Sequence, residues 1–452
     1  MIREKQNQTQ ETIWIATQEL QIKPQLKFYE KLNELLGKIG FGITVREICQ
    51  PYYSTKSDCR PPIDPEVYFK MLMVGFFENI SSERAITARS ADSLSIRAFL
   101  HYDLHEATPE HSTMSVIRQR LPESIFSKVF SVVLVAMKKH GMVKGKNLAM
   151  DTSVIEANAS LKSLVNRMTE ESYTEYIKKL AAESGIDPED KASVARFDRK
   201  RANRKTSNKE WYNPNDPDAK IGKTKDGATD MIFKPEHVVD LDTGAIVDAN
   251  ILDGDKGDTG ELEERIINAQ IRLNDISDDP IENEIMESVT ADAYYYNTGK
   301  ITDIQGFGIA TVIPDKDYNR HLDKLSDEEQ ASVESAESAV KSQTGKALLK
   351  RRGMYVERSF AHVLDCGGAR RTKLRGKPNN QKRYFIATAC FNLSLLMRLL
   401  FGFGTPKQLL AMLKNALNFA FLQLNLLLNK VLVCCWNYFF FYIVKERFYI
   451  NF

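Results

Sequence analysis

The chain of 452 residues is longer than one small hydrophobic core requires, so two or three packed units are expected. Its hydrophobic share of 43% and charged share of 27% are ordinary for a soluble globular protein. The formal net charge of +2 is too small to indicate a nucleic-acid partner. The six cysteines form no C-x-x-C pair and the seven histidines do not cluster with them, which argues against a structural zinc site. The polar N-terminus carries no signal-peptide pattern, so a reducing cytoplasm is expected.

The N-terminal third is predicted to be helical. Residues 1–58 form a mixed segment with short helical patterns, and residues 59–143 show helical spacing of apolar positions throughout. Pro65 suits a first helical turn, and Ser81–Glu83 and His111–Thr113 offer N-caps for two later helices. We therefore expect several short helices joined by tight turns.

These helices carry arginines at Arg84, Arg89, Arg118 and Arg120. Short helices with exposed arginines could form a helix-turn-helix-like domain that reads DNA. A plain helical bundle fits the same pattern equally well, so both interpretations stay open.

Two later segments are predicted as strands that end on an aspartate. At Lys146 the apolar period changes from helical to strand-like, and residues 147–150 lead into Asp151. Residues 288–291 are predicted as another strand, which again ends on an aspartate, Asp292. The sequence therefore places two carboxylates at strand ends.

The segment between these strands combines an insertion, a hairpin and a helix. Residues 160–230 form a long polar insertion rich in lysine and arginine. Strands are expected at residues 237–241 and 245–252, and Asp242-Thr243-Gly244 between them suits a tight turn. A helix is predicted near residues 261–273.

The remaining elements complete a mixed sheet. Residues 309–313 are predicted as the last strand, and Pro314 ends it. Residues 326–337 are predicted as an acidic loop, followed by a helix that carries Glu357. A mixed sheet flanked by helices is the architecture that this order implies.

Carboxylates arranged in this way could hold divalent metal. Magnesium prefers oxygen ligands and is usually held by a few carboxylates together with phosphate oxygens. Two such ions about 3.5–4 Å apart support in-line displacement at phosphorus. From the pattern alone, however, an acid of this kind is more often an ordinary surface or capping residue.

Charge is distributed unevenly along the chain. The stretch from Lys341 to Arg383 holds thirteen lysines and arginines, whereas its acids are Glu357 and Asp365. Residues 240–288 are mostly acidic. The basic block is either a phosphate-binding surface or a solvated loop face.

Several motifs together resemble bacterial insertion-sequence transposases of the DDE class. Ala149–Asn158 resembles their first-aspartate strand, and Thr290–Tyr295 their second-aspartate strand. Tyr355–Phe360 resembles their glutamate helix, and Gly368–Arg371 with Leu374–Gly376 its basic trailer. The segments at residues 216–220 and 237–242 are similar to the lead into their second strand. Arg60–Ile63, Ile80–Arg84 and His111–Thr113 look like the family's helical N-terminal domain. The resemblance runs in order over roughly residues 40–400.

This resemblance implies an RNase H-like catalytic core, here assigned to residues 144–403. Asp151, Asp292 and Glu357 would be catalytic and would bind two Mg²⁺ ions, with Mn²⁺ able to substitute. The enzyme would cut double-stranded DNA at the element's inverted repeats and join the 3′ ends to target DNA. It would work as a homodimer, in the cytoplasm and associated with the nucleoid.

One departure concerns the DNA contacts. Many relatives have a lysine about two helical turns after the glutamate, but Leu364 stands seven residues after Glu357. Other basic side chains are therefore expected to contact DNA: Arg352, Arg358, Arg370, Arg371, Lys373 and Arg375, together with Arg118 and Arg120 of the helical domain.

The tail, residues 404–452, is a second departure because it is very apolar. Its longest uncharged run, residues 431–444, is shorter than the roughly 20 residues of a membrane-spanning helix. We expect a helical extension that packs on the core or on a partner. A membrane anchor is the less favoured interpretation.

Three other functions fit part of the sequence. A degenerate transposase copy would bind DNA without cutting it, as Leu364 and the tail allow. A helical DNA-binding regulator would use residues 60–140 but leaves the strand-borne aspartates unexplained. A repair or RNA-cleaving nuclease of the same fold is disfavoured by the N-terminal domain and the basic trailer.

Overall fold

The computed structural model describes residues 25–53, 63–202, 206–257, 261–277, 286–315 and 325–449. The chain forms two compact units, one of residues 31–404 and one of residues 1–30 with 405–452. The larger unit contains the sheet and all of the predicted site residues, so it is described first.

The N-terminal part of this unit is helical, as predicted. Its helices are α1 (Gln25–Lys38), which begins in the smaller unit, α2 (Phe41–Cys49), α3 (Pro65–Phe77), α4 (Glu83–Asp92), α5 (Leu94–Phe99), α6 (His111–Arg120) and α7 (Glu123–Lys139). Pro65 opens α3, where Asp64 caps the helix by accepting a 2.9 Å hydrogen bond from the Glu66 amide. The expected cap at His111–Thr113 was wrong by a few residues, because α6 already begins at His111 and Glu110 takes the extended N-cap conformation.

A mixed sheet follows, which among the described residues has seven strands. They are β1 (Asn147–Thr152), β2 (Ile155–Glu156), β5 (Lys220–Lys223), β6 (Thr229–Asp240), β7 (Ile246–Asp253), β8 (Ser288–Thr290) and β9 (Ala310–Val312). The long strand β6 is antiparallel to β1 and β2 on one side and to β7 and β5 on the other. Strands β1, β8 and β9 are parallel to one another. The predicted mixed sheet with flanking helices is therefore confirmed.

The hairpin between β6 and β7 turns as the sequence predicted. Gly244 adopts a positive φ of 80°, and its amide donates a 2.8 Å hydrogen bond to the Asp240 carbonyl. A side chain at this position would require the left-handed conformation that glycine tolerates best.

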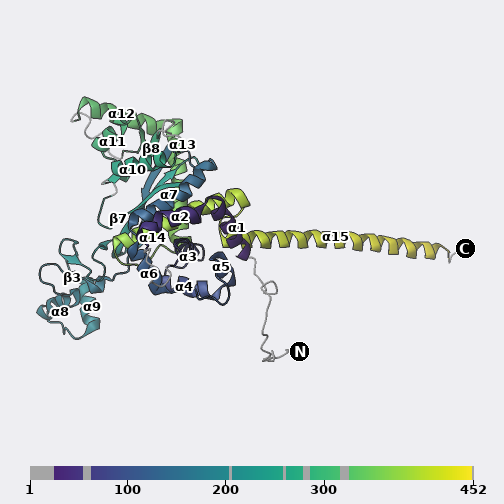
Figure 1. Ribbon diagram of the computed structural model, residues 1–452, viewed down its shortest axis with the longest axis horizontal. Helices are drawn as coiled ribbons and strands as arrows, with labels where there is room; N and C mark the ends of the chain where they lie inside the picture. The colour runs from purple at the N-terminus through teal and green to yellow at the C-terminus, as the bar shows by residue number, and fades with distance from the viewer. Residues whose placement is uncertain are drawn as a thin grey trace. The chain divides into compact units, whose positions relative to one another are not determined.

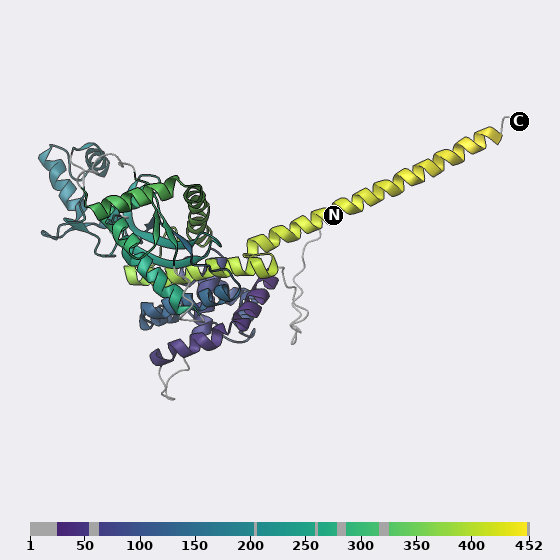
Figure 2. The ribbon, with the colours of Figure 1, turned by 90° about the horizontal axis from the view of Figure 1, so that it is seen from above.

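Helix α14 (Lys377–Phe401) lies between the sheet and the N-terminal helices, as Figure 2 shows. It also covers the backbone of β7. The Asn392 amide donates to the Ile246 carbonyl at 2.8 Å and accepts from the Ile246 amide at 3.0 Å, and Gln381 accepts from the Ile251 amide at 2.6 Å. Side chains thus satisfy strand groups that would otherwise be open to pairing with another chain.

The polar insertion is ordered rather than merely a loop. It contains α8 (Tyr173–Glu183), α9 (Lys191–Lys200), the short pair β3 (Val165–Asn166) with β4 (Trp211–Tyr212), and β5. Trp211 is buried and contacts the rings of Tyr173 and Tyr176 at 5.3 Å between ring centroids. In Figure 1, α8, α9 and β3 form a lobe beside the sheet.

The prediction of an acidic loop at residues 326–337 was wrong. These residues begin helix α12 (Asp327–Lys341), where Ser326 and Glu329 form a capping box. Acidic side chains in the first turn also favour the helix, because they face the positive end of its dipole. A sharp corner then leads into α13 (Gln343–Phe360), where a Cβ on Gly345 would collide with the Ala339 carbonyl.

The tail is helical, as predicted, in α15 (Pro406–Tyr449). One apolar helical stretch among the described residues, Lys377–Val433, is long enough to cross a membrane by length and composition. Of its most apolar window, 67% is buried within the protein, as in a core helix of a soluble protein, so this stretch is weak support for a membrane span.

Candidate active site

Asp151 and Asp292 lie at neighbouring strand ends. In the parallel pair of β1 and β8, Ala149 is opposite Thr290, so the same register continued by two residues places Asp151 opposite Asp292. Asp292 follows β8 after one residue, Ala291, and its carboxylate accepts a 2.8 Å hydrogen bond from the Tyr294 amide. The sequence pattern placed each aspartate at a strand end, and the pairing of β1 with β8 brings the two ends side by side.

Arg352 lies between the two carboxylates. Its Nη2 atom is 2.8 Å from Asp151 Oδ2 and 3.4 Å from Asp292 Oδ2. Arg352 projects from α13, the helix that carries Glu357. All three side chains are partly buried, so their charges are screened less than on an open surface. The sequence had suggested Arg352 as a DNA contact, whereas here it is the counter-ion of both aspartates.

Glu357 lies in the same hollow as Asp151. This hollow has a volume of about 720 Å³, and both side chains line it together with Arg358, Arg370 and Lys225. Glu357 is exposed. Among the described residues, no group of three histidines, cysteines, aspartates or glutamates is gathered closely enough to hold a metal ion. The structure thus pairs two of the acids through Arg352 and places the third on the wall of the adjoining hollow.

The basic side chains that line the hollow or follow it in sequence differ in their contacts. Arg358 lines it and is exposed. Arg370 is tied to the protein, because its Nε atom lies 2.8 Å from Asp365 Oδ1 and its guanidinium donates to the Val154 carbonyl at 3.1 Å. Arg371 reaches Glu156 at 3.7 Å yet stays largely exposed.

Lys373 and Arg375 are also exposed and follow Arg371 along the same loop. Asn158 donates a 3.0 Å hydrogen bond to the Lys373 carbonyl, which ties this loop to the segment after β2. Their side chains are therefore presented to solvent by a fixed backbone.

The two arginines predicted in the helical domain differ from each other. Arg118 forms an ion pair with Glu83 at 2.9 Å, and both side chains are mostly buried. Arg120 is exposed, and its guanidinium lies over the Tyr53 ring at 5.4 Å. Arg120 is thus available to a ligand, whereas Arg118 joins α6 to α4.

Two residues near the site were missed by the sequence reasoning. Lys225 reaches the hollow from the turn between β5 and β6, and only the pairing of these strands reveals it. His237 is fully buried beside the site and was predicted simply as a strand residue. The sequence feature that could have drawn attention to His237 is its polar side chain at the start of a predicted strand that continues with two valines.

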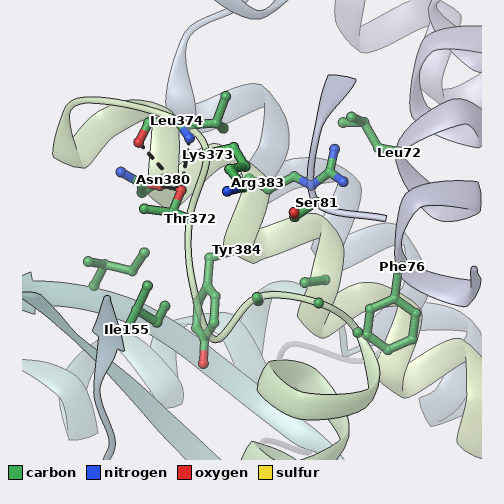
Figure 3. Close-up of a pocket in the computed structure, with 15 residues that line it drawn as sticks. Leu72, Phe76, Ser81, Ile155, Thr372, Lys373, Leu374, Asn380, Arg383 and Tyr384 are labelled. Atoms are coloured by element: carbon green, nitrogen blue, oxygen red, sulfur yellow. Dashed lines mark hydrogen bonds between the residues drawn. The ribbon is translucent and has the colours of Figure 1, made fainter. Parts of the chain in front are cut away.

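A second, much smaller cavity of about 40 Å³ lies between α3, α14 and the loop after α13 (Figure 3). It is lined by residues such as Leu72, Phe76, Ile155 and Tyr384, and by no carboxylate. It has room for little more than a water molecule, and its lining offers no carboxylate that could hold a metal ion.

Two protein-family models match the chain. The model described as Transposase domain (DUF772) matches residues 18–120, and the model described as Transposase DDE domain matches residues 192–393. The chain belongs to the DDE transposases. The predicted family and the RNase H-like fold are thereby confirmed. No curated protein and no solved structure matches the chain.

Membership of this family establishes an enzyme that cleaves DNA and transfers strands. Transposases bind the ends of their own element, and DDE transposases use divalent metal ions. The match of residues 192–393 includes Asp292 and Glu357, whereas Asp151 lies between the two matched ranges. The role of each acid is therefore argued from geometry.

Proposed function

We propose that this transposase cuts DNA at the terminal inverted repeats of its element and joins the 3′ ends to target DNA, using Asp151, Asp292 and Glu357 as metal-binding carboxylates. The observation that carries the proposal is the position of Arg352 between Asp151 and Asp292. A cation held by two carboxylates at adjacent strand ends marks a place whose charge favours positive ions.

The donor set fits hard divalent ions. All three side chains offer carboxylate oxygens, the ligand type that Mg²⁺ and Mn²⁺ take in proteins. Two Mg²⁺ ions, when bound, would neutralise phosphate charge and activate a water or a 3′-hydroxyl as nucleophile. Asp151 and Asp292 would hold them from the strand ends, and Glu357 would reach them from the hollow once Arg352 leaves the pair.

The basic side chains around the hollow would position the DNA backbone. Arg358 and Lys225 line the hollow together with Asp151 and Glu357, and Arg371, Lys373 and Arg375 are exposed on the loop that follows Arg370. Contacts to phosphate fix the register of a duplex without reading its sequence. A helical N-terminal domain at residues 59–143, with Arg120 exposed, would choose the element's ends. Joining two ends requires two active sites, so the working complex is a homodimer. It would act on DNA in the cytoplasm, associated with the nucleoid.

Substitution of each acid tests the proposal. Asp151→Asn, Asp292→Asn and Glu357→Gln should each lower cleavage of an element-end duplex by at least 100-fold while leaving its binding within about threefold, since each removes a charged ligand and little volume. Asp242→Asn is the matched control, because Asp242 pairs with Arg351 at 3.0 Å but lies outside the hollow. Calcium should support binding without cutting. Cleavage at the wild-type rate in the Asp151→Asn protein would overturn the assignment.

A second candidate is a copy that binds DNA without cutting it. It is favoured by one observation: Leu364, at the position where many relatives have a lysine, is fully buried. The same experiment separates the two, because a copy of this kind would bind end DNA yet show no cleavage above the Asp151→Asn background in Mg²⁺ or Mn²⁺.

A further inference from the structure

We propose that His237 is a positioning residue that fixes helix α13, and with it Glu357, against the strand that carries Asp151. This inference rests on the proposed function of the two acids. In the antiparallel pair of β1 and β6, Asp151 and His237 are direct partners. Directly paired residues point to the same face of a sheet, so the imidazole lies beside the first aspartate.

The His237 ring is held on every side. It stacks on Phe360 at 4.1 Å between ring centroids with an interplanar angle of 7°. Its Nδ1 atom lies 2.8 Å from Ser359 Oγ, and its Nε2 atom lies 2.6 Å from Tyr384 Oη. Tyr384 projects from α14 toward the sheet, as Figure 3 shows. One side chain on β6 thus connects α13, which carries Glu357, to α14.

The hydrogen bonds select one form of the imidazole. Ser359 Oγ donates to the Val356 carbonyl at 2.8 Å, so this oxygen is left to accept from His237 Nδ1–H. Nε2 then accepts from the Tyr384 hydroxyl. The ring is therefore neutral with its proton on Nδ1, in agreement with burial that lowers the His237 pKa to about 3.

These contacts flank Glu357 directly. Val356 precedes it, and Ser359 and Phe360 follow it within one helical turn. Immediately after Phe360, the helix widens into a π-helical turn, Ala361–Cys366. Such turns are rare and often occur at functional sites. A directional bond at this junction sets the rotation of α13, and hence the direction in which Glu357 projects.

An apolar residue could fill the same space but could not supply this direction. Burying an imidazole is favourable only when both nitrogens are hydrogen-bonded, and here both are. At this position the protein therefore has two oriented hydrogen bonds of His237 in place of purely apolar packing. Small displacements of a catalytic group cost much rate, so the bonds serve the placement of the acids.

The matched test compares two buried serines. Ser359 and Ser394 each donate to the carbonyl three residues earlier, at 2.8 and 2.7 Å, but Ser359 also accepts from His237. Ser359→Ala should weaken Mn²⁺ binding about threefold to tenfold, measured by electron paramagnetic resonance on the full chain without DNA. It should lower the cleavage rate at saturating DNA at least tenfold, with the apparent affinity for DNA unchanged. Ser394→Ala should leave both quantities within twofold of wild type.

Variants of His237 supply the second arm. His237→Phe keeps the stacking and should show a larger loss of Mn²⁺ affinity than Ser359→Ala. His237→Asn restores a hydrogen-bond donor toward Ser359, so it should recover part of the Mn²⁺ affinity that His237→Phe loses. If His237→Phe does not fold, the serine pair decides. Equal Mn²⁺ affinities in the Ser359→Ala and Ser394→Ala proteins would overturn the inference. That result, with Asp151→Asn still inactive, would leave the proposed function intact, whereas an active Asp151→Asn protein would remove the function itself.

Discussion

The Arg352 guanidinium lies 2.8 Å from the Asp151 carboxylate and 3.4 Å from that of Asp292, so one positive charge is shared by two strand-end acids. Two carboxylates at neighbouring positions would otherwise repel each other. Because a divalent cation would bind the same oxygens, it has to compete with the guanidinium for them. Arg352 therefore opposes metal entry, and its release would add a positive charge beside the hollow where DNA is expected.

Arg352→Ala should therefore bind Mn²⁺ more tightly than the wild-type protein in the absence of DNA. A partly exposed ion pair contributes about 1 kcal/mol, which corresponds to a decrease in the Mn²⁺ dissociation constant of about fivefold. Arg351→Ala is the control, because the neighbouring Arg351 pairs with Asp242 at 3.0 Å instead. Titration followed by electron paramagnetic resonance gives both constants. Unchanged Mn²⁺ affinity in the Arg352→Ala protein would show that the arginine does not compete with metal.

The positions of Asp151 and Asp292 could be predicted because strands end where their apolar pattern ends. The position of Arg352 could not, since it depends on how α13 crosses β1, which no local pattern encodes. His237 is similar, because its proximity to Asp151 follows from the register of β1 and β6.

The misassigned helix α12 is a different case. Its Ser326 and Glu329 are three residues apart, the spacing of a capping box, and were present in the sequence. The run of acidic residues around them suggested a solvated loop instead. The capping-box spacing was thus present in the sequence but was given less weight than the charge pattern.

Neutralising the exposed part of the basic block should weaken DNA binding for any sequence. The triple variant Arg371→Ala, Lys373→Ala and Arg375→Ala removes three exposed charges, and Arg370 is left unchanged because it holds Asp365 and the Val154 carbonyl. Fewer counterions would be released on binding. The slope of log affinity against log salt should therefore fall by about 2 to 3 units.

A matched triple variant provides the control for this slope. Lys128, Lys139 and Lys144 are exposed and do not line the hollow. Their replacement by alanine should leave the slope within about one unit of wild type. Equal slopes in the two triple variants would favour a solvated face at residues 371–375.

Arg118 and Arg120 should separate structural from DNA-binding roles in the helical domain. Arg118→Ala leaves Glu83 mostly buried without its ion pair, so the free energy of unfolding should fall by about 2 kcal/mol. Arg120→Ala should change it by less than about 1 kcal/mol, since that side chain is exposed. Urea denaturation measures both. Competition between element-end and random duplexes should then reveal reduced preference in the Arg120→Ala protein; equal preference in that variant and wild type would exclude Arg120 from end recognition.

The stability of the fold should fall in mild acid because of His237. Burial lowers its pKa from 6.5 to about 3 in the folded protein, whereas an unfolded chain retains the ordinary value. Between these values the unfolded state binds one more proton than the folded state, so the free energy of unfolding rises with pH over this window and falls as acid is added. From pH 7 to pH 5 this single group should remove about 2 kcal/mol.

The variant His237→Asn isolates this effect, because asparagine does not titrate. The carboxyls of Asp240 and Asp248, whose pKa values burial raises, act in the opposite direction, but both proteins contain them. Urea denaturation at pH 5, 6 and 7 should therefore show a wild-type stability that falls about 2 kcal/mol further than that of the variant. His105→Asn, at an exposed position, is the control and should follow the wild-type curve. Parallel curves for wild type and His237→Asn would mean that the imidazole takes up a proton while folded, which is incompatible with its place between Ser359 and Tyr384.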